Sequence, residues 1–356
     1  STGKIKKDYE IKGFIKKGKL DILNKYSIKD LNFIFNIKDK QYNLRDIGGN
    51  FNQIGLIFPS IKIKKKDNQF LINGKLINKA KDINIKLLNN FLRNGFKNNK
   101  IEEINFSSDS DFTFTINKNF KISNFDLKSI INLNKLVYKN NLPSLKKYLP
   151  SLKELIKLEK HKIFINYQKE QLNVEGKGRI TIEDYTDKIN YKITKKQNDY
   201  FFDTNINIDN NPLLIDILEY KKKKRLKSIL KVNGIYKKDQ QVKINSMSFK
   251  ENNNYFLIKD LNLNKYFNII DIKTLDLNYI NNKKKRNEIT IKKNKKKYTL
   301  SGKSLDLTNL VNSIINDHDK KSSSFFNNIN LEIDVKIKRI YLDSLTFVNN
   351  LNGFIN

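Results

Sequence analysis

The eight residues LEIDVKIK, at positions 331–338, alternate apolar and polar side chains without interruption. Successive side chains of a β-strand point to opposite faces, so this period of two predicts a strand with one buried face. β-branched and aromatic residues are abundant, and such side chains pack well on a pleated surface. The same alternation recurs along the chain, so we expect half-buried strands to be the dominant element. The further alternating stretches lie at 31–37, 112–116, 163–167, 189–193 and 204–208.

Polar turn signals separate the apolar runs, as expected where a chain reverses direction. The runs are spaced by about 10 to 15 residues, which suits hairpins and leaves no room for the helical crossovers of parallel strands. The sequence therefore predicts antiparallel pairing. The turn signals lie at 38–40, 65–69, 251–254, 281–287 and 294–297.

A repeated pattern, apolar-x-x-apolar-x-apolar, breaks the strict alternation once in each copy. One extra residue between two inward positions is what a β-bulge or a sharp bend in a strand requires. We therefore expect a bulge or bend at each copy. The copies are IKDLNF (28–33), IEEINF (101–106), ISNFDL (122–127), IKDLNL (258–263), IKTLDL (272–277) and LDSLTF (342–347).

A second repeated pattern is apolar-x-Gly. Positions i and i+2 of a strand share a face, so each glycine is expected on the apolar face, where it allows close approach of another group or a bend. Hairpin flexibility is the alternative interpretation of any single glycine. The six glycines are Gly13, Gly74, Gly176, Gly234, Gly302 and Gly353.

Repeated units of this kind predict a structure that grows in one direction. At about 4.8 Å between neighbours, roughly 20 strands would extend on the order of 90 to 100 Å. Such a sheet twists, and its apolar face cannot stay in water, because burial is worth roughly 25 cal/mol per Å². We expect a mainly β fold: an elongated, twisted antiparallel β-sheet curled into an open apolar groove. The chain begins with Ser1, and residues 1–356 are expected to be one continuous groove segment of a longer protein.

The inner wall of this groove is expected to carry the apolar side chains of the alternating stretches. These are Leu31, Phe33, Phe35, Phe112, Phe114, Ile116, Ile163, Ile165, Ile180, Ile182, Ile206, Val232, Leu275, Leu277, Leu331, Ile333, Val335 and Ile337.

Helical spacing of apolar residues is rare in this sequence. We expect short helices near 82–94, 143–158, 212–220 and 307–316, either capping an open end of the sheet or simply connecting strands. Pro150 would break the second of these.

The charge is strongly positive, at +33, and the chain has no cysteine. A nucleic acid or an anionic lipid is one explanation of that charge, and a biased genome that favours Lys, Asn and Ile is the other. Several basic runs, such as 221–225 and 283–286, fall at expected turns. They would form a basic rim beside the apolar groove that suits lipid headgroups, or they would keep exposed strands from pairing with other chains.

No catalytic constellation stands out, and we expect neither enzymatic activity nor a cofactor or metal. His161 and His318 are the only histidines, and neither has metal-ligand spacing. VEGKGRITI, at 174–182, contains half of a GxGxxG fingerprint without a following helix. The DxD of Asp109 and Asp111 could bind a cation, although a solvated turn is the simpler interpretation.

The repeated patterns resemble the AsmA-like superfamily of Gram-negative envelope proteins, and within it the YhdP-type proteins. The most specific similarity runs from GKSLDLTNLVNSIIND, at 302–317, through INLEIDVKIKRIYLDSLTFVNNLNGFI, at 329–355. It has the family's order of a strand ending in GxxLDL, a short helix, a low-complexity loop and paired strands. Residues 9–78 also look like the family's repeat region, but the lysine content is not a family feature.

This resemblance implies a periplasmic protein that is tethered to the inner membrane by a segment not included here. Its β-groove would hold the acyl chains of phospholipids and carry them toward the outer membrane. A second hypothesis is a scaffold that assists assembly of outer-membrane proteins at its β-edges. A third is nucleic-acid binding on the basic face, although the lysines spread over many turns instead of one stripe, so no nucleic acid is expected as partner.

Overall fold

The structure is a computed structural model. It describes residues 9–22, 26–51, 54–82, 85, 100–139, 155–182, 185–215, 218–238, 240–295, 297–309, 311, 332–343 and 345–355.

The chain divides into two compact units. The first unit contains residues 1–141, 153–183 and 190–197, and the second contains 142–152, 184–189 and 198–356. Among the residues that the structure describes, nineteen strands form one hydrogen-bonded sheet, and two more form a small sheet of their own. The prediction of a mainly β fold with an antiparallel sheet is confirmed. No helix among the described residues is long and apolar enough to cross a membrane.

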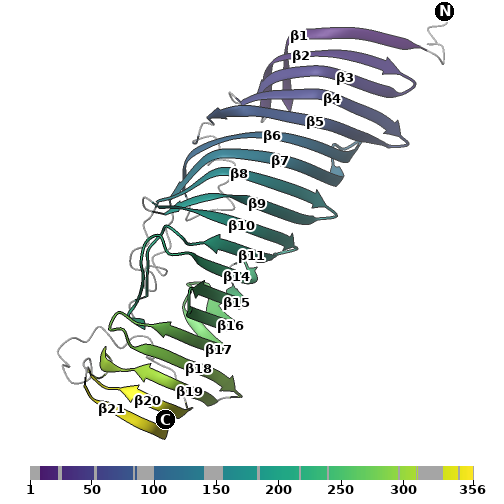
Figure 1. The fold of residues 1–356 in the computed structure, drawn as a ribbon. Helices are drawn as coiled ribbons and strands as arrows, with labels where there is room; N and C mark the ends of the chain where they lie inside the picture. The colour runs from purple at the N-terminus through teal and green to yellow at the C-terminus, as the bar shows by residue number, and fades with distance from the viewer. Residues whose placement is uncertain are drawn as a thin grey trace, which may run out of the picture. The chain divides into compact units, whose positions relative to one another are not determined.

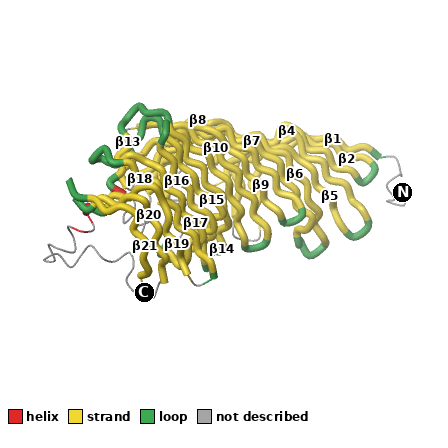
Figure 2. The backbone as a smooth tube through the Cα atoms, turned by 60° about the horizontal axis from the view of Figure 1, so that its bottom comes forward, coloured by secondary structure: helices red, strands yellow, loops and turns green. Residues whose placement is uncertain are grey.

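The first unit consists of nine long strands that pair antiparallel in chain order, together with part of a tenth. They lie side by side in Figure 1 and are joined mostly by loops at their ends in Figure 2. The strands are β1 (Glu10–Ile22), β2 (Tyr26–Lys38), β3 (Gln41–Phe51), β4 (Ile54–Lys66), β5 (Gln69–Asp82), β6 (Lys100–Asn117), β7 (Ile122–Lys139), β8 (Leu155–Gln168) and β9 (Gln171–Ile182); β10 (Tyr185–Lys196) contributes to both units.

The second unit continues the antiparallel pattern, except that β19 and β20 are parallel. The small sheet pairs β12 with β13 and interrupts the chain between β11 and β14. Its strands are β11 (Asp199–Asn207), β12 (Leu213–Ile215), β13 (Tyr220–Lys222), β14 (Ser228–Lys237), β15 (Gln241–Glu251), β16 (Asn254–Asn264), β17 (Ile269–Ile280), β18 (Arg286–Asn294), β19 (Lys297–Asp306), β20 (Glu332–Tyr341) and β21 (Phe347–Ile355).

Several expected bulges are present where the repeated pattern places them. The third residue of three copies, Asp30, Asn124 and Asp260, has a left-handed backbone with φ between 49° and 52°. In the copy at 101–106 the pairing register of β6 and β7 shifts between Ile101 and Glu103. Two expectations were wrong. Residues 272–277 run through β17 without a register shift against β16, and residues 342–346 belong to the connection between β20 and β21.

The four segments expected to be helical have different outcomes in the structure. Where a helix was expected over 212–220, residues 213–215 form β12 and Tyr220 begins β13, because Tyr220 packs into an apolar cluster of the large sheet; residues 216 and 217 lie outside the described residues. A helical turn does begin at Thr308, whose N–H bonds to Asp306 Oδ1 at 3.0 Å, and Val311 N–H bonds to the Leu307 carbonyl at 2.9 Å. The rest of that helix and nearly all of 82–94 lie outside the described residues. So does 143–154, whereas residues 155–158 begin β8.

Candidate functional site

A ladder of apolar residues and glycines crosses the nine strands of the first unit on one face. Each member is the direct cross-strand partner of the next, so the register of every pair continues the apolar face from one strand to its neighbour. All members are partly exposed and none is fully buried. We call this row the first-unit ladder, and its members are Gly13, Phe35, Leu44, Ile61, Gly74, Phe112, Leu127, Tyr167 and Leu172.

Aromatic rings extend this ladder along the strands as well as across them. Neighbouring ring centroids are 5.8–6.3 Å apart, within the range at which aromatic side chains attract one another. The described strands of this unit pack chiefly against the strands beside them in the sheet. Among the described strands, the side chains of this apolar face therefore have their main neighbours within their own layer. The rings belong to Phe58, Phe112, Phe114, Phe125 and Tyr167.

The glycines of the apolar-x-Gly pattern lie beneath cross-strand rings. A Cβ built on Gly13 would come 2.5 Å from Phe35 Cζ, and one on Gly176 would come 2.3 Å from Tyr191 Cζ. Gly74 lies under the Phe112 ring in the same way, Gly234 lies against the Lys243 backbone as well as the Phe202 ring, and Gly302 lies against the backbone of Glu288 beside a register shift. The expected close approach is thus confirmed at these five, whereas Gly353 has open space.

His161 is held on the apolar face by a bulge in β8. Lys160 has φ 54°, and the β8–β9 register shifts between Glu159 and Lys162. The ring lies over Gly178, is 2% exposed, and its Nε2 is 2.9 Å from the Arg179 carbonyl. Burial lowers the pKa of His161, against the opposing effect of that hydrogen bond. This histidine is therefore a packed, neutral side chain.

The glycine pair of the half fingerprint is structural too. Gly176 and Gly178 lie in the middle of β9, where they accept the rings of Tyr191 and His161. Asp109 of the DxD pairs with Lys75 at 2.8 Å, and the buried Ser110 between the two aspartates bonds to Ser129 at 2.7 Å. Within the described residues, no group of three or more His, Asp or Glu side chains could hold a metal ion.

The predicted inner-wall residues keep to the less exposed face wherever the structure describes them. Ile180, Leu277, Val335 and Ile337 are buried, at 2–9% exposed. The others are partly buried, and Leu331 lies outside the described residues.

The second unit has a ladder of the same kind, but its middle is covered. Ile206, Leu230, Phe249, Phe256, Leu277, Ile289, Gly302, Ile337 and Leu351 pair in succession and form the second-unit ladder. From Phe249 to Ile289 its members are 4–8% exposed. The cover is the β12–β13 hairpin, whose Leu213, Ile215 and Tyr220 belong to the same cluster.

Tyr220 anchors this hairpin. Its ring is 1% exposed, and its centroid lies 4.8 Å from that of Phe256 and 5.9 Å from those of Phe249 and Tyr279. Its hydroxyl donates a short hydrogen bond to the buried Glu251. Burial, with Glu251 as the second cause, raises the pKa of Tyr220. An apolar surface whose members stay partly exposed in the described part of the first unit is therefore covered here by the chain itself.

The two chain segments that enter and leave the hairpin, 208–211 and 222–228, form a polar neck. Asp187, 4% exposed, accepts the backbone N–H groups of Asp209, Asn210 and Asn211 at 2.8–3.1 Å. Lys222, 1% exposed, donates to the carbonyls of Asp209, Asn211 and Lys223 at 2.8–3.2 Å. These bonds satisfy polar groups that would be costly to bury unpaired.

Sequence reasoning missed the neck, although one signal was available. Asp187 stands at i−2 of Ile189, on a strand whose alternation placed Ile189 and Tyr191 inward. A carboxylate at an inward position of a strand needs buried hydrogen-bond partners. An aspartate at such a position was therefore the signal that a polar cluster lies there.

Comparison of the chain with protein-family models, with curated proteins and with solved structures finds no match.

Proposed function

We propose that the apolar face of the first unit binds the acyl chains of phospholipids. The chain would act as part of a non-enzymatic bridge that moves these lipids between the membranes of a cell envelope. The observation that carries this proposal is the first-unit ladder, which is apolar or glycine at every step across nine strands while every member keeps part of its surface exposed.

The driving force is the transfer of acyl chains out of water. Each methylene that leaves water contributes about 0.8 kcal/mol, so long tails gain strongly from contact with a lined surface. The rings of Phe112, Phe114 and Tyr167 offer large contact area. Successive strands present similar side chains, so a tail meets similar contacts as it moves from one strand to the next, which keeps barriers low. The resemblance to AsmA-like proteins supports the same proposed function.

Adjacent positions on β8 provide a matched test. Ile165 is partly buried and pairs with Ser129 and Val174 on the apolar face, whereas Phe164 is 44% exposed on the opposite face. Ile165→Asp places a charge where tails would lie, and Phe164→Asp places the same charge elsewhere. Each purified variant is analysed for co-purified phospholipid by mass spectrometry and for uptake of a fluorescent fatty-acyl probe.

We expect the parent and Phe164→Asp to carry phospholipid and bind the probe, and Ile165→Asp to lose most of both. Circular dichroism confirms that each variant keeps its strand content. Equal lipid content in Ile165→Asp and the parent would rule out the proposed face. No lipid in any of the proteins would favour the scaffold hypothesis instead.

A further inference from the structure

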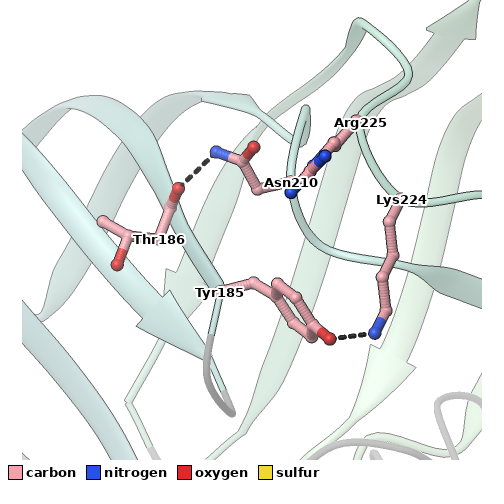
Figure 3. Close-up of a pocket in the computed structure, with 5 residues that line it drawn as sticks. All are labelled: Tyr185, Thr186, Asn210, Lys224 and Arg225. Atoms are coloured by element: carbon pink, nitrogen blue, oxygen red, sulfur yellow. Dashed lines mark hydrogen bonds between the residues drawn. The ribbon is translucent and has the colours of Figure 1, made fainter.

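A pocket with a volume of about 630 Å³ lies beside the polar neck of the second unit. Its lining comes from the start of β10, from the segment before β12 and from the segment after β13, as Figure 3 shows. The lining residues are Tyr185, Thr186, Asn210, Lys224 and Arg225.

The charged groups of this lining are both cations. Lys224 Nζ lies 4.3 Å from the centroid of the Tyr185 ring and donates a hydrogen bond to its hydroxyl (Figure 3). Arg225 makes no hydrogen bond or ion pair with any residue that the structure describes. A guanidinium offers five N–H donors in a planar fork that matches the oxygens of a phosphate.

Two carboxylates near the pocket, among the described residues, already accept hydrogen bonds. Both oxygens of Asp187 accept N–H groups from the neck, and Asp209 Oδ1 accepts the N–H of Ser228 at 3.0 Å. The described lining of the pocket contains the cations Lys224 and Arg225 and no carboxylate.

The neck holds the lining in place before any ligand arrives. Asp187 fixes the backbone N–H of Asn210, whose side-chain amide donates to the Thr186 carbonyl at 2.7 Å and keeps a second N–H (Figure 3). Lys222, two residues before Lys224, ties the entering and leaving segments together. The Asn210 amide and the Lys224 ammonium are therefore positioned in advance, and little binding energy is spent on ordering these two groups.

We propose that this pocket binds a phosphate group through Lys224, Arg225 and the Asn210 amide. The volume exceeds that of a phosphate ion, so a phosphate ester with a small organic part also fits. Two sources share this chemistry: inorganic phosphate, and the phosphate of a phospholipid headgroup. The second source rests on the proposed lipid-binding function, and the first does not.

The test uses the full chain at low salt and measures binding by isothermal titration calorimetry. The probes are sodium phosphate, dihexanoyl phosphatidic acid below its micelle concentration, and uncharged dihexanoylglycerol. The variants are Lys224→Gln and Arg225→Gln, and the control is Lys221→Gln, an exposed lysine of the same basic run outside the lining. Lost charge-assisted hydrogen bonds are expected to weaken binding about tenfold in the two pocket variants and less than twofold in the control.

Three outcomes are distinguishable. If phosphate and phosphatidic acid both bind and both depend on Arg225, the phosphate site is established. If only phosphatidic acid binds in that manner, the site is established as a headgroup site. If neither binds, or if Lys221→Gln weakens binding as much as Arg225→Gln, the proposal is overturned. Ile165→Asp separates the two functions, because it removes acyl binding in the first unit and leaves the phosphate site unchanged.

Discussion

The ring of Phe112 lies directly over Gly74, its cross-strand partner, so that a Cβ on this glycine would come 2.4 Å from Phe112 Cζ. Phe58 and Phe114 flank the Phe112 ring, with centroids 6.2 and 5.9 Å away, and limit where it could move. The glycine thus leaves space for an aromatic side chain, and the same kind of contact occurs at Gly13, Gly176 and Gly234.

Gly74→Ala is expected to destabilise the protein by about 1–3 kcal/mol, because the added methyl group overpacks the Phe112 ring. Gly48→Ala is the control, since no atom lies within 4 Å of its added Cβ. That substitution is expected to be neutral or slightly stabilising, through lower entropy of the unfolded chain. Urea unfolding measures the stability of both variants. Equal unfolding midpoints would show that the Phe112 ring moves aside at no cost in stability.

Tyr220→Phe tests the anchor of the β12–β13 hairpin. It removes the hydroxyl that donates to buried Glu251 and leaves that carboxylate with Asn254 as its remaining side-chain donor, at 3.1 Å. We expect a loss of about 1–3 kcal/mol in unfolding free energy. Tyr236→Phe removes a hydroxyl from a side chain that is 37% exposed and should change little. The prediction fails if the two variants unfold at the same denaturant concentration.

Asp187→Ala tests the neck. It removes the acceptor of three backbone N–H groups, and we expect a loss of about 2–4 kcal/mol in unfolding free energy. Asp187→Asn keeps one acceptor oxygen and should recover part of that loss. Asp203→Ala, an exposed aspartate on β11, is the matched control. Thermal unfolding compares the four proteins, and an Asp187→Ala curve that overlays the control would refute the role.

Protonation of His161 should destabilise the fold. Burial lowers its pKa below the ordinary value of 6.5, so below that pH the unfolded chain binds the proton more readily than the folded chain. The free energy of unfolding is therefore highest above pH 6.5 and falls as the pH drops toward the lower pKa of the folded state.

His161→Gln removes this titration and should flatten the pH dependence of stability between about pH 5 and 7 relative to the parent. Guanidinium unfolding at several pH values gives the comparison. If the stabilities of parent and variant change with pH in parallel, His161 makes no contribution to the pH dependence of stability.

Much of the apolar face was predictable from the sequence, because alternation is a local property. Phe112, Phe114 and Ile165 stand at every second position, and a strand must send them to one face. The glycines were predictable as sites of close approach for the same reason. Asp30, Asn124 and Asp260 show that the repeated three-residue step was a usable signal for distortion, although residues 272–277 show that it is not sufficient.

Antiparallel strands with one apolar face follow from the sequence alone, since side-chain direction in a strand depends only on position. Which ring meets which glycine depends on the register between strands, and that register is a property of the folded chain. The tertiary structure also shows that the chain leaves the large sheet after Asn207 and returns to it at Ser228. Tyr220 packs against Phe249 and Phe256, and the stability that this contact contributes cannot be predicted from a local sequence pattern. The polar neck follows from the same docking, because the buried ends of Asp187 and Lys222 need partners that only the folded chain brings within reach.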